Sequence, residues 1–222
     1  MKMTKLFFVR HGKTQWNLEG RYQGAHGDSP LLPESYAEIG QLAKYLDGTK
    51  FAHIYTSPLP RAVDTAETLA KDLKQDVPVT IAKGLREFDL GAMEGMRFTD
   101  VEAKYPEELH AFRHAPADYH PEKIHGETFQ QLIDRMTPTI EKIVHTDQTG
   151  TENLILVSHG AALAAEIQHL LGTPIKDLRK DGGLTNSSVT VLETNDDGKT
   201  FQLIRWNETS YLHRKLMPSD TI

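Results

Sequence analysis

Two histidines in this chain each follow an apolar run and precede a glycine. The tripeptide Arg10-His11-Gly12 comes directly after the apolar residues 6–9, and Ser158-His159-Gly160 comes directly after the apolar residues 154–157. Such short apolar runs are typical of buried strands in parallel sheets, and open α/β sheets bind ligands at the carboxyl ends of their strands. An imidazole placed there can act as a nucleophile, and a neighbouring guanidinium binds phosphate oxygens. The pattern predicts phosphoryl transfer through a histidine, without a metal ion.

A third candidate group, Arg61, lies near the start of an expected helix. Ser57 is expected to cap this helix and Pro58 to occupy its first position. Arg61 then falls in the first turn, away from the apolar face. A positive charge there opposes the helix dipole, and this cost is understandable if an anion binds at the helix start. Taken alone, Arg61 also fits a solvated surface position.

A carboxyl group that assists phosphoryl transfer is expected in the segment after the third strand. Residues 85–95 mix glycines with the acidic residues Glu87, Asp89 and Glu94. A phosphatase needs a proton donor for its leaving oxygen, and a carboxylic acid can fill that role. The residue types alone leave all three acids open as donors, and they also fit a loop with structural carboxylates.

The elements that would position these groups alternate between strand and helix patterns. Strands are predicted over residues 4–9, 51–56, 77–81 and 153–158, with a β-hairpin over 187–194 and 201–207. Helices are predicted over residues 34–46, 58–73, 98–114 with a break near Pro106, 126–145 and 161–171. This alternation predicts a three-layer α/β/α sandwich with a mostly parallel central sheet and a small helical cap. One domain of residues 1–222 is expected, with the cap inserted at roughly residues 96–125.

The composition excludes several other classes of function. The chain has 222 residues, no cysteine and a formal net charge of −6. Thiol catalysis and thiolate metal sites are excluded, and the negative charge argues against non-specific nucleic-acid binding. No apolar stretch approaches the ~18 residues of a membrane span, and the first residues lack a signal-like apolar region. A cytoplasmic protein with no membrane or nucleic-acid partner is expected, and a homodimer is left open.

Several short motifs, taken in order, resemble those of one enzyme family. They are Arg10-His11-Gly12 with Trp16-Asn17, Tyr22-Gln23-Gly24, Asp28-Ser29-Pro30-Leu31, Arg61, Glu87, Gly126-Glu127-Thr128-Phe129 and Ser158-His159-Gly160. Each motif is weak alone. Together, and in their strand context, they resemble the histidine phosphatase superfamily in its cofactor-dependent phosphoglycerate mutase-like branch. The resemblance runs from Leu6 to about Val191.

The resemblance implies a role for each matching residue. His11 would attack phosphorus in line and form a phosphohistidine. Arg10, Arg61 and His159 would hold the phosphoryl oxygens, while Glu87 would protonate the leaving oxygen and then activate water. His11 must be neutral to attack, whereas His159 is more useful when protonated. No metal or cofactor is implied. Further phosphate contacts would come from Asn17, Gln23, Gly24 and Gly160.

The chain departs from the family's pattern at the expected substrate rim. Lys13 stands where the family commonly has an acid, and the segments 25–27 and 31–40 are longer than usual. The cap is short for a mutase and its basic residues are widely spaced, so the resemblance favours hydrolysis of a small phosphorylated metabolite. Cap side chains are also candidates to line the pocket, although packing within the cap is the simpler interpretation: Phe98, Tyr105, Phe112, His114, Tyr119 and His120.

Two alternative functions remain at this point. A 2,3-bisphosphoglycerate-dependent phosphoglycerate mutase would use the same phosphohistidine, but it must exclude water and return the phosphoryl group to a bound sugar acid. A non-catalytic module would keep the fold and bind phosphorylated ligands without turning them over. Such modules usually lack one of the core groups, whereas this chain has all of them.

Overall fold

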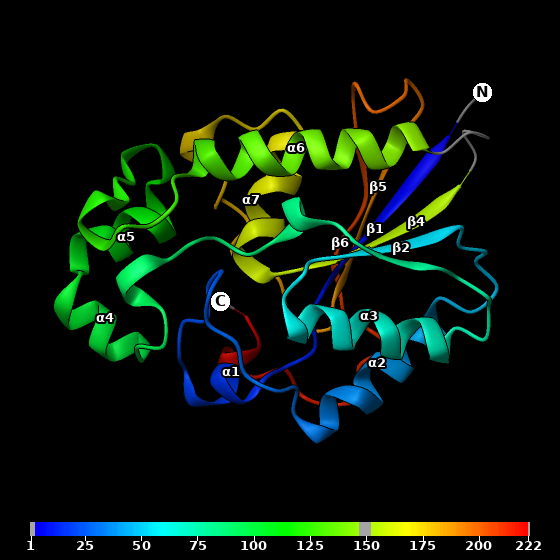
Figure 1. Ribbon diagram of the computed structural model, residues 1–222, viewed down its shortest axis with the longest axis horizontal. Coiled ribbons are helices and arrows are strands. Elements are labelled where there is room, and N and C mark those ends of the chain that lie inside the picture. Colours follow the sequence, from blue (N-terminus) through cyan, green and yellow to red (C-terminus); the bar gives the residue numbers. More distant parts are fainter. Residues whose placement is uncertain (1–2, 147–151, 222) are drawn as a thin grey trace.

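The computed structural model describes residues 3–146 and 152–221, which form a six-stranded sheet between two layers of helices (Figure 1). The strands lie in the order β3-β2-β4-β1-β5-β6. The first four are parallel to one another, whereas β5 and β6 run antiparallel to their neighbours. This arrangement confirms the predicted mostly parallel sheet. The strands are β1 (Thr4–Arg10), β2 (His53–Thr56), β3 (Val79–Ile81), β4 (Asn153–Ser158), β5 (Val189–Thr194) and β6 (Gln202–Glu208).

Helices cover both faces of the sheet, as the predicted three-layer sandwich requires. Helices α2 and α3 pack together on one face, and α6 and α7 pack together on the other (Figure 1). Helices α4 and α5 lie beyond one end of the sheet, and the break between them falls at Pro106 as predicted. Among the described helices, none combines the length and apolar content that a bilayer crossing needs. The helices are α1 (Gln15–Glu19), α2 (Pro33–Tyr45), α3 (Pro60–Asp72), α4 (Phe98–Lys104), α5 (Pro106–His114), α6 (Phe129–Thr146) and α7 (Gly160–Leu170).

Apolar side chains fill the core on both faces of the sheet because successive residues of a strand point to opposite sides. In β1, Leu6 and Phe8 pack into the cluster formed with α6 and α7, and Val9 packs into the cluster formed with α2 and α3. All three side chains are fully buried. Burial on both faces explains why these strands are continuously apolar in the sequence.

The pairing of β1 with β4 brings the two histidine motifs together. Arg10 lies opposite Ser158 in the parallel register, and the His11 amide donates to the Ser158 carbonyl at 3.0 Å. The chain leaves both strands at the same edge of the sheet, and α7 begins directly after His159. Two motifs almost 150 residues apart therefore meet, as the strand patterns predicted.

The start of α3 corrects one sequence prediction. The helix begins at Pro60, and Leu59 stands at the N-cap position without a side-chain cap, so Ser57 and Pro58 lie outside the helix. A residue that precedes a proline is driven out of the helical region, which keeps Leu59 extended with ψ of 135°. Arg61 still falls in the first turn, but its side chain is buried rather than solvated.

Candidate active site

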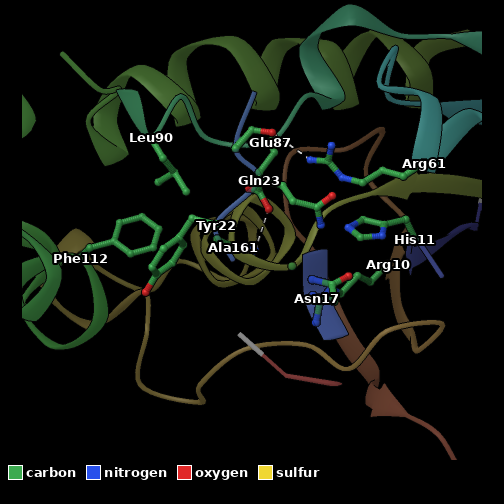
Figure 2. A pocket seen from close by; sticks show the side chains of 12 residues that line it. Arg10, His11, Asn17, Tyr22, Gln23, Arg61, Glu87, Leu90, Phe112 and Ala161 are labelled. Carbon is green, nitrogen blue, oxygen red and sulfur yellow. Dashed lines mark hydrogen bonds between the residues drawn. The ribbon is translucent and has the colours of Figure 1, made fainter. Parts of the chain in front are cut away.

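A small cavity of about 30 Å³ opens at the carboxyl edge of the sheet (Figure 2). Eight of the nine site residues expected from the sequence line it, and the ninth, His159, lies with its ring centroid 5.2 Å from that of His11. Space on this scale holds two or three waters or a small anionic group. The lining residues are Arg10, His11, Asn17, Tyr22, Gln23, Gly24, Arg61, Glu87, Leu90, Phe112, Gly160 and Ala161.

His11 is held in one tautomer by the backbone. Its Nδ1–H donates to the carbonyl oxygen of Gly12 at 2.7 Å, which leaves Nε2 without a proton when the ring is neutral. Burial, together with the charges of Arg61 and Arg10, holds the pKa of His11 well below its ordinary value. A buried, neutral imidazole with a free Nε2 lone pair is the form that can attack phosphorus.

His159 is completely buried behind His11. Its Nε2 lies 2.7 Å from the hydroxyl of Ser57, while its Nδ1 is buried without a hydrogen-bond partner. Burial and the charge of Arg61 hold the pKa of His159 well below its ordinary value. The protein alone therefore disfavours the protonated His159 expected from the sequence, because buried cations nearby oppose a further positive charge.

Arg10 is anchored by the carbonyl groups of two distant segments. Its Nη1 donates to the carbonyl of Leu184 at 2.5 Å and to the carbonyl of Asp220 at 2.7 Å. Burial lowers the pKa of Arg10 to about 10, so the guanidinium still carries its charge at neutral pH. Its Nε is buried and has no partner, so this N–H is not used by the described residues of the protein. The carboxylate of Asp220 also accepts from Lys13 at 2.7 Å, so Lys13 is part of this anchor.

Arg61 is anchored by the loop of residues 24–28. Its Nη1 donates to the carbonyl of Gly27 at 2.9 Å and to the Asp28 carboxylate at 2.8 Å, and its Nη2 donates to the carbonyl of Gly24 at 2.9 Å. These bonds pull the guanidinium from the start of α3 to the cavity wall. Because its Nε is buried and unpaired, Arg61, like Arg10, keeps a donor that the protein does not use.

The same loop is organised by Glu94. The Glu94 carboxylate accepts amide hydrogen bonds from Ala25, His26 and Gly27 at 2.6–3.0 Å, and a further one from Leu90 at 3.1 Å. Gly24 must remain a glycine here, since a Cβ atom would lie 2.2 Å from a Glu94 oxygen. Glu94 therefore shapes the loop that holds Arg61, and it does not line the cavity.

Glu87 is the acid that faces the cavity. Its carboxylate accepts from the amides of Phe88 at 2.9 Å, Ala162 at 2.8 Å and Ala161 at 3.3 Å, the last two at the start of α7. Arg135 fixes the backbone behind it by donating to three carbonyls, that of Glu87 among them at 3.0 Å. The third candidate acid, Asp89, is turned away toward His26, whose Nε2 is 3.0 Å distant.

Two of the expected phosphate-binding side chains, those of Asn17 and Gln23, are held by neighbouring polar residues and share a contact with Thr14. The Oδ1 of Asn17 accepts from the amide of Thr14 at 3.1 Å and from Asn186 at 3.3 Å, which leaves its amide nitrogen to donate elsewhere. Gln23 donates to the Thr14 hydroxyl at 2.9 Å and accepts from Ser29 at 3.0 Å. These bonds use one N–H of the Gln23 amide and its oxygen, while the side chain still lines the cavity.

The two glycines that follow the histidines allow close packing, and the second of them, Gly160, also lines the cavity. A Cβ atom at Gly12 would lie 3.0 Å from Ser35 in α2, so this glycine allows α2 to approach. A Cβ atom at Gly160 would lie 2.9 Å from Nε of Arg10. Gly160 therefore allows the Arg10 guanidinium to lie across the start of α7. Among the described residues, no three histidine or acidic side chains are grouped as metal ligands.

Some residues of the site gave no usable signal in the sequence. Leu90 and Ala161 line the cavity only through their place in the fold, whereas Phe112 is the one of the six candidate cap residues that does line it. Arg135 acts on backbone carbonyls, which every residue has. A periodic pattern or a short motif cannot reveal such contacts.

Comparison with known protein families gives a match over most of the chain. The family model of the histidine phosphatase superfamily (branch 1) matches residues 6–209. This range contains every residue that lines the cavity.

Individual relatives include both phosphatases and mutase-like proteins. A broad-specificity phosphatase of Saccharomyces cerevisiae is 31% identical over 94% of this chain and 87% of its own length. A probable phosphoglycerate mutase of Cronobacter sakazakii is 33% identical over 78% of this chain and 77% of its own. The structure of a mycobacterial glucosyl-3-phosphoglycerate phosphatase superposes with a TM-score of 0.82 at 26% identity, covering 93% of this chain and all of that one (100%).

Proposed function

The chain belongs to branch 1 of the histidine phosphatase superfamily, and we propose that it hydrolyses small phosphate monoesters through a phosphohistidine formed on His11. The observation that carries this proposal is the setting of His11: a buried ring with Nδ1 bonded to the Gly12 carbonyl, whose pKa is held well below its ordinary value by burial and by the charges of Arg61 and Arg10. The segment of residues 96–125 serves as a cap over this site within a single domain.

In the first step, Nε2 of His11 attacks phosphorus and the ester oxygen leaves with the proton of Glu87. Arg10 and Arg61 each have an unpaired Nε that can donate to the phosphoryl oxygens as their charge shifts in the transition state. The unpaired Nδ1 of His159 is a further donor. A bound phosphoryl dianion would favour the protonated form of His159, which the protein alone disfavours.

In the second step, the phosphohistidine is hydrolysed. The Glu87 carboxylate takes a proton from water, and the resulting hydroxide oxygen attacks phosphorus. The P–N bond breaks, inorganic phosphate leaves and His11 returns to its neutral form. The fixed position of Glu87 at the start of α7 supports both roles of this carboxyl group.

The covalent intermediate tests this proposal directly. Enzyme quenched during turnover should carry base-stable, acid-labile phosphate on His11, and vanadate should inhibit as a pentacoordinate mimic. His11→Ala should abolish both turnover and labelling, whereas His213→Ala, at an exposed histidine, should change neither. Absence of label in the wild type during turnover would remove the covalent mechanism.

A second test concerns Glu87 as the acid. Glu87→Gln should slow hydrolysis of glycerol phosphate far more than hydrolysis of p-nitrophenyl phosphate. Glycerol is a poor leaving group that needs a proton, whereas p-nitrophenolate leaves without protonation. Asp89→Asn serves as the matched control. Equal losses on both substrates would exclude Glu87 as the proton donor.

Mutase activity is the second candidate, since some relatives are named as probable phosphoglycerate mutases. Incubation of 3-phosphoglycerate with and without 2,3-bisphosphoglycerate separates the two reactions. Release of inorganic phosphate supports hydrolysis, whereas formation of 2-phosphoglycerate that depends on the bisphosphate supports a mutase. Failure to turn over any phosphate monoester would instead favour a non-catalytic binding module.

A further inference from the structure

One fully buried carboxylate lies outside the cavity and takes no part in the proposed chemistry. It belongs to Asp220, in a turn of residues 218–220 that packs against α1 (Figure 1). Three donors reach this carboxylate: Nζ of Lys13 at 2.7 Å, Nη1 of Arg214 at 2.5 Å and the backbone amide of Met217 at 2.6 Å. Charge-assisted hydrogen bonds of this kind are strong, so the carboxylate is held firmly in one position.

Lys13 ties this carboxylate to the segment that carries His11. It follows His11 by two positions, and its carbonyl accepts from the amide of Leu32 at 2.8 Å and from the hydroxyl of Ser35 at 2.7 Å. The Lys13 side chain is 10% exposed and the Asp220 side chain is not exposed at all. Solvent and salt therefore screen the ion pair between them only weakly.

Arg214 ties the same carboxylate to α2. Its guanidinium pairs with Asp220 and also with Glu38, a buried residue of that helix. Burial alone would raise the pKa of Asp220, but hydrogen bonds from Arg214 and Lys13 hold this pKa below its ordinary value. The carboxylate therefore stays ionised at neutral pH, with a cation from each of two different segments beside it.

The backbone carbonyl of Asp220 contacts the active site. It accepts from Nη1 of Arg10 at 2.7 Å and from the amide of Asn186 at 2.9 Å. Nη1 of Arg10 also donates to the carbonyl of Leu184, two positions before Asn186. If the backbone of residue 220 moved, Nη1 of Arg10 would keep only one of these two acceptors.

We propose that Lys13 and Asp220 are positioning residues for Arg10. Their ion pair holds the backbone of residue 220 where its carbonyl fixes the guanidinium, so the rate of phosphoryl transfer depends on a bond outside the cavity. The inference rests on the proposed function, in which Arg10 stabilises the phosphoryl group. The sign of the charge matters, since an acidic residue at position 13 would repel the carboxylate of Asp220.

Asp220→Ala tests the proposal because it removes the carboxylate but leaves the carbonyl that Arg10 uses. We expect kcat for p-nitrophenyl phosphate to fall about 10- to 100-fold, the effect of displacing a catalytic group by about 1 Å, with a smaller change in KM. Asp220→Asn keeps an oxygen acceptor for Lys13 and should recover part of the loss. Glu193→Ala, at a carboxylate paired with Lys5 on the sheet, should leave kcat unchanged.

A double variant separates positioning from stability. Asp220→Ala leaves the Lys13 ammonium largely buried without its carboxylate, which should lower the melting temperature. Lys13→Met in the same chain removes that charge, so the melting temperature should recover while kcat stays low. If kcat recovers together with the melting temperature, the ion pair serves stability alone and the proposal is wrong.

The guanidinium itself gives a readout that needs no turnover. In NMR spectra of protein labelled with ¹⁵N-arginine, the Nε–H signal of Arg10 is the one that Arg10→Lys removes. Asp220→Ala should shift or broaden this signal, and Glu193→Ala should not. An unchanged signal in Asp220→Ala would overturn the positioning role whatever the activity. A wild type that hydrolyses no phosphate monoester would overturn the proposed function, while the signal would still decide whether Asp220 positions Arg10.

Discussion

The two ends of the cavity hold their arginines in opposite ways. At the His11 end, Arg10 and Arg61 are anchored by backbone carbonyls and by Asp28, and each keeps one unpaired Nε. At the other end, Arg113 and Arg179 contact the lining rings of Tyr22 and Phe112 without lining the cavity themselves; Arg113 has one hydroxyl partner and Arg179 has no hydrogen-bond partner among the described residues. The difference separates two tasks. Anchored donors stabilise a transition state without reorganising, whereas the arginines at the other end support the rings that line the cavity.

The largest effect should come from an anchored arginine. Arg61→Met removes a fixed charge from the phosphoryl group, and we expect kcat to fall by about 10²- to 10³-fold, as for loss of one transition-state donor. The loss should be the same for p-nitrophenyl phosphate and glycerol phosphate, which share the phosphoryl group. Steady-state kinetics with both substrates measures this, and Arg21→Met, at an arginine paired with Glu19, is the control. A loss confined to one substrate would break the proposed division between the two ends.

A smaller effect should follow from loosening the anchor itself. Glu94→Gln leaves Arg61 in place but removes the charge that accepts four amide hydrogen bonds in and next to its loop. We expect kcat to fall about tenfold for all monoesters, since hydrogen bonds to a charged group are worth roughly 1.5–3 kcal/mol. In a double-mutant cycle, Glu94→Gln should cost little once Arg61 is already Met. Full additivity would show that Glu94 acts elsewhere, and Glu34→Gln on α2 is the matched control.

The pH dependence should also distinguish the two ends. The proposed mechanism requires a neutral His11 ring, and burial with the charges of Arg61 and Arg10 holds the pKa of His11 well below 6.5. As the pH falls through 6.5, an ordinary histidine gains a proton, but His11 should stay neutral. The rate at which His11 is phosphorylated should therefore remain constant below pH 6.5. Single-turnover rates from pH 4.5 to 7.5 test this. Arg61→Met should shift the fall of this rate at low pH to a higher pH, whereas Arg179→Met should not. If the wild-type rate already falls at pH 6.5, the lowered pKa of His11 is contradicted.

The smallest effect is expected at the Tyr22 end. Tyr22→Phe removes the hydroxyl that accepts from Arg113 but keeps the ring that lines the cavity. A net hydrogen bond contributes about 0.5–1.5 kcal/mol, so the free energy of unfolding should fall by about this amount, while kcat for p-nitrophenyl phosphate changes about twofold or less. Urea unfolding measures the first change and steady-state kinetics the second. A loss of kcat as large as that of Arg61→Met would contradict a supporting role of the Tyr22 end.

The central part of the fold and of the site follows from the sequence because strong local patterns specify it. The apolar runs before His11 and His159 are short, continuous and bounded by glycine, which predicts buried parallel strands. Once two such strands are neighbours, their carboxyl ends lie at the same edge of the sheet, and in the structure Arg10 lies opposite Ser158. The chemistry expected of these residues stays a prediction that the experiments above address.

Other features were beyond the reach of sequence patterns, for identifiable reasons. The segment Ser57-Pro58-Leu59-Pro60 has two prolines that could open a helix, and the second one prevails because it forces Leu59 to be extended. Arg179 lies in a loop without periodicity, so the surrounding sequence does not predict its contact with Phe112. The anchor of Arg10 is made by carbonyl groups, which carry no signature of residue type.

The bond between Arg10 and the Asp220 carbonyl joins residues that are 210 positions apart. During translation, at roughly 5–20 residues per second, the second partner is added about 10–40 s after the first. A ribosome-bound nascent chain cannot make this hydrogen bond until residue 220 has been synthesised and has emerged. The anchored position of the Arg10 guanidinium, on which the proposed chemistry depends, is therefore one of the last features of the site to form.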